Sequence, residues 1–147
     1  FSRYVKRLVV YDGGSIAGGT YKFPALEEVE LSDGYGSLPA AILKGSKFYL
    51  NDANWEGDCL YAGNTLVGLR ENVASVKIKD GTKRITENLF NMEELSELFI
   101  PESIQDMRGC SYNWNPDLRI TYAGSEEQWE QVKRDFSIKD ENLTFLK

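Results

Sequence analysis

Four segments of the chain share one pattern of apolar and polar positions. Apolar residues occupy the first, fourth and sixth positions of each segment, and three of the four segments end in Asp-Gly. They cover residues 5–13, 26–34, 73–81 and 95–103, so the intervals between their starts are close to one or two units of about 22 residues. A repeat of this length predicts a solenoid, because one such unit cannot bury its apolar face without a neighbour.

Each repeated segment is expected to form a short strand, and the strands are expected to stack in parallel. The Asp-Gly pair suits a turn, since glycine accepts a positive φ. A second apolar cluster follows in three of the units and predicts an outer wall made of single helical turns or 3-10 pieces. These clusters are Leu38 with Ile42 and Leu43, Ile85 with Leu89 and Phe90, and Met107 with Tyr112.

The long interval between the second and third segments predicts an insertion over about residues 47–72. Its apolar runs at residues 48–50, 59–62 and 65–69 are expected to be strands. Gly63-Asn64 separates the last two runs and is typical of a two-residue hairpin turn. Trp55 lies in the polar stretch before this hairpin and is expected to pack on it.

The C-terminal part predicts a strand, a helix and a final strand. Residues 118–122 repeat the apolar pattern in a shorter form. Ser125 and Gln128 have the spacing of a capping box, and Trp129, Val132 and Phe136 follow at amphipathic helical spacing. We therefore expect a helix over about residues 126–135 and a last strand over residues 143–146, which together close the open end of the array.

The composition argues against some classes of binding partner. The 147 residues carry a net charge of −6 and no histidine, which argues against nucleic-acid backbones and anionic membrane surfaces as partners. No apolar run approaches the length of about 20 residues that spans a bilayer. The chain begins at Phe1, almost inside a repeat, so we expect a piece of a longer polypeptide whose targeting and anchoring signals lie elsewhere.

The candidate chemistry is sparse. Cys59 and Cys110 are interpreted as two small buried residues; a bridge is the alternative, but residues about two repeats apart are expected to exceed the Cα separation of about 7 Å that it requires. Residues 52–57 resemble the start of an EF-hand loop, yet Gly63 stands where the bidentate glutamate belongs, which favours a turn over a calcium site. No metal or cofactor is predicted. Without histidine no clear nucleophile–base pair is found, so the chain is expected not to be an enzyme.

Three stretches resemble the BspA-type leucine-rich repeats of bacterial surface proteins. Residues 95–110 follow the first half of that repeat, residues 122–129 match its terminal Tyr-x-Gly-[ST]-Glu-Glu-x-Trp segment, and residues 60–66 match its Leu-Tyr-x-Gly-Asn-x-Leu hairpin. The resemblance implies a secreted or surface-anchored bacterial protein that adheres to other proteins, with no catalytic residues.

Period and resemblance together predict one domain of the α/β repeat class. It is expected to be a leucine-rich-repeat solenoid with short parallel strands, short helical or 3-10 outer segments, a β-hairpin insertion and a C-terminal capping helix. The repeats cover about residues 5–25, 26–46, 73–94 and 95–117, the insertion about 47–72, and the cap about 118–147.

The strand face is the candidate binding surface, because residues beside the fourth position of each segment point outward. Arg7–Glu28 and Glu30–Lys77 are predicted as neighbours of opposite charge, although a strand supplied by the insertion would prevent the second pair. The predicted protein-binding residues are Arg7, Val9, Glu28, Glu30, Lys77, Glu97, Phe99 and Thr121.

The favoured function is a non-enzymatic protein-binding or adhesion module. Its expected partner is an extracellular protein, such as a host protein, or a glycan, with no nucleic acid and no membrane insertion. Two alternatives remain open at this point. The chain is a structural spacer that presents another domain, or it offers a carbohydrate-binding surface around Trp55, Tyr112 and Trp114.

Overall fold

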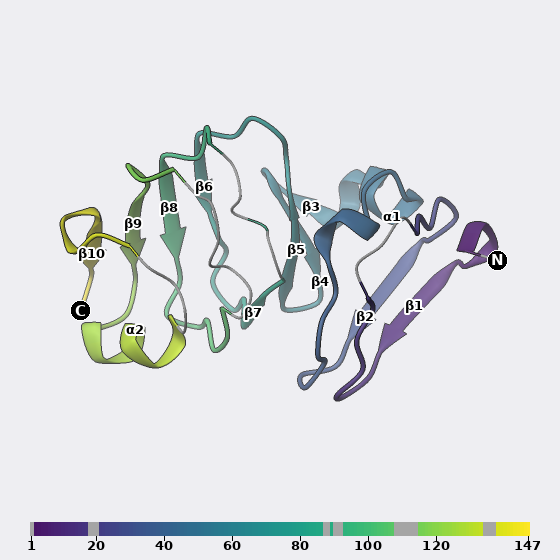
Figure 1. Ribbon diagram of the computed structural model, residues 1–147, viewed down its shortest axis with the longest axis horizontal. Helices are drawn as coiled ribbons and strands as arrows, with labels where there is room; N and C mark the ends of the chain where they lie inside the picture. Colours follow the sequence, from purple (N-terminus) through teal and green to yellow (C-terminus); the bar gives the residue numbers. More distant parts are fainter. Residues whose placement is uncertain (1, 18–20, 87–88, 90–92, 108–114, 134–137) are drawn as a thin grey trace.

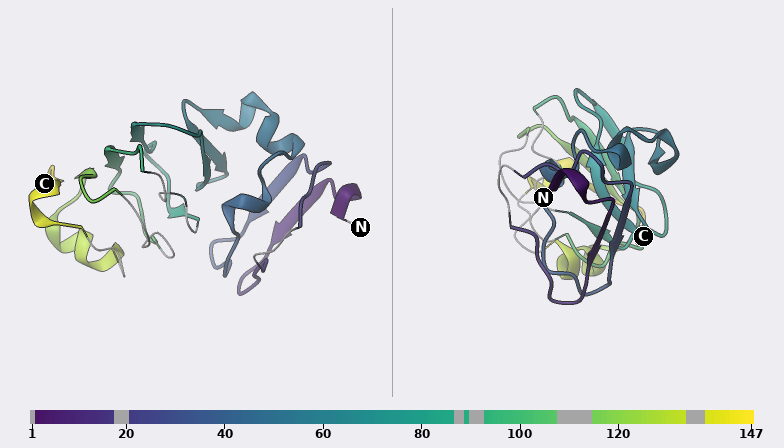
Figure 2. Two further views of the ribbon diagram at one scale, coloured as in Figure 1. Left: turned by 45° about the horizontal axis from the view of Figure 1, so that its top comes forward. Right: turned by 90° about the vertical axis from the view of Figure 1, so that its right-hand side faces the viewer.

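The computed structural model describes residues 2–17, 21–86, 89, 93–107, 115–133 and 138–147. The molecule is elongated, and its two termini lie at opposite ends of the long axis (Figures 1 and 2). The described strands form three sheets that follow one another along this axis. Two short α-helices and several 3-10 turns connect and cover them.

The first sheet, here called the N-terminal sheet, pairs β1 (Arg7–Val10) with β2 (Glu28–Leu31). The hairpin sheet has the order β3 (Trp55–Glu56), β4 (Cys59–Ala62), β5 (Thr65–Leu69) and β7 (Arg84–Ile85). The C-terminal sheet has the order β10 (Leu143–Phe145), β9 (Arg119–Tyr122), β8 (Glu97–Ile100) and β6 (Ser75–Lys77).

The predicted leucine-rich-repeat solenoid is wrong. Among the described residues the repeated strands do not form one continuous parallel sheet, and the three sheets mix parallel with antiparallel pairs. The antiparallel β4–β5 hairpin lies between β2 and β6 (Figure 1) and forms its backbone pairs with β3 and β7. The α-helices in the described part of the chain are α1 (Lys47–Leu50) and α2 (Glu126–Val132), and neither lies at one of the apolar clusters that were expected to form the outer wall.

Within the N- and C-terminal sheets, the repeated segments nevertheless pair in parallel at equivalent positions. Leu8 pairs with Val29, while Leu98 pairs with Val76 on one side and Ile120 on the other. Each of these residues occupies an inward position of its segment, and a slip by one residue would turn it toward solvent. The apolar pattern therefore fixes the register inside each sheet.

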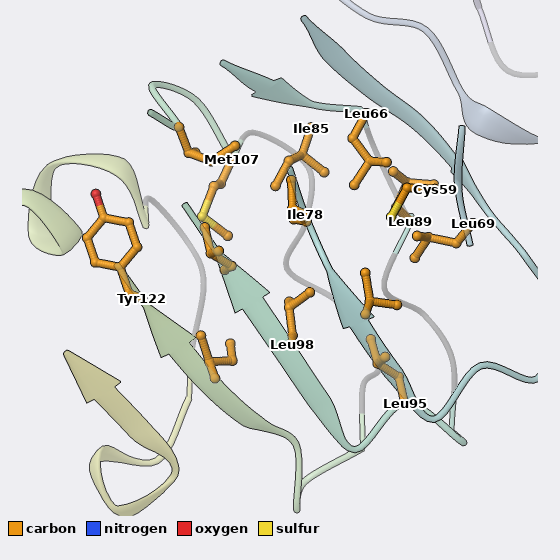
Figure 3. Packing of buried hydrophobic residues seen from close by; sticks show 14 of the residues in the cluster. Cys59, Leu66, Leu69, Ile78, Ile85, Leu89, Leu95, Leu98, Met107 and Tyr122 are labelled. Carbon is orange, nitrogen blue, oxygen red and sulfur yellow. The ribbon is translucent and has the colours of Figure 1, made fainter. Parts of the chain in front are cut away.

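The β4–β5 hairpin is buried on both faces and separates two apolar clusters. Cys59, Tyr61, Leu66 and Leu69 belong to the C-terminal cluster, whereas Leu60, Ala62 and Val67 belong to the N-terminal cluster. The C-terminal cluster also contains the inward residues of the C-terminal sheet, and Figure 3 shows Ile78 and Leu98 together with Leu66 and Ile85 in this cluster. The hairpin is therefore a partition shared by both halves of the core.

A β-bulge in the hairpin changes which side the residues of β5 face. Tyr61 pairs with Leu66 and Leu60 pairs with Gly68, so Val67 is an extra residue on β5. Because one extra residue shifts the alternation of side chains, Leu69 returns to the same side as Leu66. The hairpin bounds and its Gly63 turn, which has a φ of 60°, agree with the sequence prediction.

The segment before the hairpin differs from its prediction. Residues 48–50 were expected to be a strand, but they belong to helix α1. Ser46 begins this helix, since its Oγ accepts a hydrogen bond from the backbone N–H of Tyr49 at 3.0 Å. A short apolar run does not distinguish helix from strand by itself, and the capping serine decides here.

The predicted C-terminal elements are confirmed where the structure describes them. Helix α2 begins at a complete capping box: the backbone N–H of Ser125 donates to Gln128 Oε1 at 2.8 Å, and that of Gln128 donates to Ser125 Oγ at 3.3 Å. Trp129 and Val132 are buried in the C-terminal cluster, while Phe136 lies outside the described residues. Strand β10 then pairs with β9 and completes the C-terminal sheet.

The outer clusters take several forms. Ile42 lies in a 3-10 turn, η2 (Ala40–Ile42), as the sequence predicts, whereas Ile85 belongs to strand β7. Leu89 and Met107 are buried, and Phe90 and Tyr112 lie outside the described residues. No helix in the described part of the chain combines the length and apolar character needed to cross a membrane.

Candidate functional site

The eight predicted binding residues lie on two separate surfaces. One group of four lies on β1 and β2, and the other lies on β6, β8 and β9. The first group is Arg7, Val9, Glu28 and Glu30, and the second is Lys77, Glu97, Phe99 and Thr121. Since the hairpin sheet stands between the two sheets, the structure does not join them into one strand face (Figure 1).

On the N-terminal sheet, Arg7 lies between two glutamates. Its Nε is 3.5 Å from Glu28 Oε2, which confirms the predicted pair, and its Nη2 donates to Glu30 Oε1 at 2.5 Å. The hydrogen bond and charge of Glu30 raise the pKa of the Arg7 guanidinium. The predicted Glu30–Lys77 pair is wrong, because β2 and β6 belong to different sheets. All three side chains of this trio are exposed, so the surface pairs contribute little stability.

On the C-terminal sheet, the outward side chains form two rows across the strands. Ser75, Glu97 and Arg119 occupy the first row, and Arg119 Nη2 donates to Glu97 Oε1 at 2.5 Å. In the second row, Lys77 lies beside Phe99, with its Nζ 5.3 Å from the centre of the ring. These contacts hold the Arg119 side chain against Glu97 and the Lys77 side chain against Phe99.

A hollow of about 420 Å³ lies over this face. The second row continues through Thr121 to Thr144 of β10, and the turn η4 (Asp140–Asn142) adds residues at one side. The Asn142 side chain is tied down, since its Nδ2 donates to the backbone oxygen of Pro116 at 3.2 Å. The outward-facing residues that line the hollow are Ser75, Lys77, Glu97, Phe99, Arg119, Thr121, Glu141, Asn142 and Thr144.

Several lining residues were missed from the sequence. Arg119 is opposite Glu97, and the predicted position of Thr121 beside Phe99 already implied this register, but Arg119 was left out of the predicted residues. Thr144 carries a usable signal, because it alternates with Leu143 and Phe145 in the predicted last strand. Glu141 and Asn142 belong to a 3-10 turn that leaves no periodic signal in the sequence.

Trp55 is a weak centre for a carbohydrate site. The guanidinium carbon of Arg70 lies 3.9 Å from the centre of the Trp55 rings, and Tyr49 packs edge-on at 5.1 Å. The Trp55 Nε1 also donates to the backbone oxygen of Tyr49 at 2.7 Å. The Trp55 side chain is thus engaged in contacts within the chain, in line with its predicted packing role. The other two residues of the predicted carbohydrate-binding surface, Tyr112 and Trp114, lie outside the described residues.

Cys59 is a free, buried thiol. Burial raises its pKa, which disfavours the reactive thiolate, and its Sγ lies 3.9 Å from the backbone oxygen of Lys77. Burial likewise raises the pKa of Tyr61, whose hydroxyl accepts the backbone N–H of Lys79 at 3.0 Å. Cys59 thus contacts the last residue of β6, and Tyr61 contacts the segment that follows this strand. Cys110 lies outside the described residues.

The EF-hand-like stretch forms the turn η3 (Asp52–Asn54) followed by β3, and Gly57 has a φ of 60°. Asp52 is highly exposed and pairs with Arg70 at 3.4 Å. Within the described residues, no group of three or more acidic, histidine or cysteine side chains could hold a metal ion.

The chain was also compared with known proteins. No protein-family model matches it, and searches of curated proteins and of solved structures found no significant match. The geometry of its surfaces is therefore the main guide to function.

Proposed function

We propose that the chain is a non-enzymatic binding module that recognises another protein through the outward face of its C-terminal sheet. The observation that carries the proposal is the hollow over that face, with the half-buried ring of Phe99 among polar side chains. An aromatic ring inside a polar surround is a common arrangement of protein-binding surfaces, because the ring supplies apolar contact and the surround supplies orientation.

The surroundings of Phe99 also support recognition by contact. Glu97 and Arg119 neutralise each other beside the ring, and Thr121 offers a hydroxyl on the neighbouring strand. The side chains stand on paired strands, so they are held in place before a partner arrives. Preorganised groups of this kind lower the entropic cost of binding.

The resemblance of the sequence to repeats of bacterial surface proteins supports the same proposal. It favours a secreted or surface-attached protein, whose partner is an extracellular protein. The acidic balance of the chain fits a protein partner better than a nucleic acid.

Binding measurements on matched variants test the proposal. The chain is immobilised and exposed to a panel of purified extracellular-matrix and serum proteins, and each interaction is measured by surface plasmon resonance. Phe99→Ala is compared with Val9→Ala, since Val9 occupies the equivalent outward position on the N-terminal sheet. We expect Phe99→Ala to weaken binding by about tenfold or more and Val9→Ala to leave it unchanged.

Other outcomes would contradict the proposal. Equal effects of the two substitutions would place the contact away from the C-terminal sheet. Failure to bind any protein of the panel would favour the structural spacer. Binding to a glycan array that quenches tryptophan fluorescence would instead favour a carbohydrate-binding surface.

A further inference from the structure

The charges around the hollow are arranged unevenly across the C-terminal sheet. Arg119 and Glu97 pair with each other in the middle. Lys77 stands at the β6 side, where its contact is the ring of Phe99, and it forms no ion pair with any described residue. Glu141 stands at the β10 side in turn η4 and likewise has no basic partner in the described part of the chain. The hollow thus has a cationic side and an anionic side.

From this arrangement we infer that the hollow binds an extended peptide segment with a carboxylate at one end, an apolar side chain two positions further along, and a basic side chain at the other end. The inference rests on the proposed protein-binding function and names the chemistry of the partner. The carboxylate pairs with Lys77, the apolar side chain packs on Phe99, and the basic group pairs with Glu141.

The dimensions of the sheet set the spacing between the two charges of the ligand. Three strand intervals separate β6 from β10, which corresponds to about 14 Å at about 4.8 Å per interval. An extended chain advances about 3.3 Å per residue, so the distance equals about four residues. Glu141 lies in η4, three residues before Thr144, so this width is the minimum separation, and the acidic and basic residues of the segment should be at least about four positions apart.

The polar groups between the two ends suit such a segment. Thr121 and Thr144 offer hydroxyls that donate or accept hydrogen bonds, and the fixed Asn142 side chain offers an amide. These groups match the backbone N–H and C=O groups of an extended peptide, which need partners once they leave water. The central Glu97–Arg119 pair is already neutral and does not demand a further charge from the ligand.

Selection from a peptide library tests the inference. The library contains capped heptapeptides whose second and sixth positions carry Asp, Asn, Lys or Gln, while the other positions vary over Leu, Tyr, Thr, Ser and Gly. Peptides are selected on the immobilised chain, and the affinities of those enriched are measured by fluorescence anisotropy. We expect enrichment of peptides with one Asp and one Lys, and with Leu or Tyr two positions from the Asp on the side of the Lys, because alternate side chains of an extended chain face the same way.

Charge exchange then identifies the contacts. For an enriched peptide, Lys77→Glu should weaken binding by about fivefold or more, and replacement of the peptide Asp by Lys should restore much of the loss. Glu141→Lys should act in the same way on the peptide Lys. Lys6→Glu is the matched control, because Lys6 is an exposed lysine just before β1 and lies outside the hollow.

The outcomes separate this inference from the proposed function. If neutral peptides are enriched and their binding still depends on Phe99, the inferred charge pattern of the ligand is wrong, while the proposed protein-binding function stands. Absence of binding to every peptide and to every protein of the panel overturns both. Lys77-dependent binding of an acidic oligosaccharide without any peptide binding overturns the peptide as the ligand class.

Discussion

Leu60 and Gly68 face each other across the β4–β5 hairpin, and a methyl group on Gly68 would come within 3.1 Å of Leu60 Cδ2 and 3.2 Å of its Cβ. Leu60 is completely buried, so its side chain has little room to move away. We expect Gly68→Ala to lower the free energy of unfolding by about 1–3 kcal/mol, the usual cost of overfilling a packed core. Urea denaturation followed by circular dichroism measures this loss.

A double-mutant cycle identifies the source of that loss. Leu60→Ala alone should cost about 2–5 kcal/mol, because it leaves a cavity. In the Leu60→Ala background the crowding is gone, and Gly68→Ala should then cost little. If Gly68→Ala costs the same in both backgrounds, Leu60 is not the residue that excludes a side chain at this position.

The capping box of α2 should contribute measurably to stability. Ser125→Ala removes the acceptor of the Gln128 N–H, and we expect a loss of about 1 kcal/mol in the free energy of unfolding. Ser125→Asp is the control, since its carboxylate accepts the same hydrogen bond and also interacts favourably with the helix N-terminus. A similar loss in both variants would show that the hydroxyl acts through another contact.

Trp129 should be among the residues that matter most for stability at the C-terminal end. Its side chain is 2% exposed and lies 5.3 Å from Tyr122, measured between ring centres. We expect Trp129→Ala to cost about 3–5 kcal/mol and Trp129→Phe to cost clearly less, because phenylalanine keeps much of the apolar contact. Unfolding midpoints in urea provide the test, and a cost below about 1 kcal/mol for the alanine variant would contradict the packing seen here.

Stability should decline in acid partly through Asp12. The Ser32 hydroxyl and the Gly34 N–H, which lies 3.1 Å from Asp12 Oδ1, lower the pKa of this carboxyl below its ordinary value of 3.8. A lowered pKa in the folded state means that the ionised form stabilises the fold above pH 3.8 and that this contribution disappears as the pH falls through the lower, folded-state pKa.

Two measurements check this dependence on pH. An NMR titration of the Asp12 carboxyl should show the lowered pKa directly, and Ser32→Ala should move it back toward its ordinary value. Asp12→Asn should make the unfolding midpoint fall less steeply in acid than in the unmodified chain. An unchanged slope would show that other carboxylates, such as Glu27 and Glu71, account for the acid sensitivity.

The sequence predicted local structure well because the relevant signals are local. The apolar pattern placed Leu98 against Val76 and Ile120, and the Ser125–Gln128 spacing located the start of α2. The hairpin bounds followed from two apolar runs around Gly63. In each case one strand, turn or cap carried enough information by itself.

The arrangement of the sheets was not predicted, because it depends on which strand edges meet. Nothing in the repeat indicated that β5 would pair with β7 while β2 and β6 remained apart. The same limit applies to the candidate site. Lys77 and Phe99 were predicted from the repeat, but Glu141 could be assigned to the hollow only once the fold was known.

The two-sided hairpin also limits how the chain can be shortened. Removing residues 47–72 would not leave a simpler, continuous protein, since Leu60 and Val67 cover one cluster while Leu66 and Leu69 cover the other. Such a deletion would expose the N-terminal and the C-terminal apolar clusters to solvent at the same time. The segment that interrupts the sequence pattern is thus needed for the stability of both halves of the molecule.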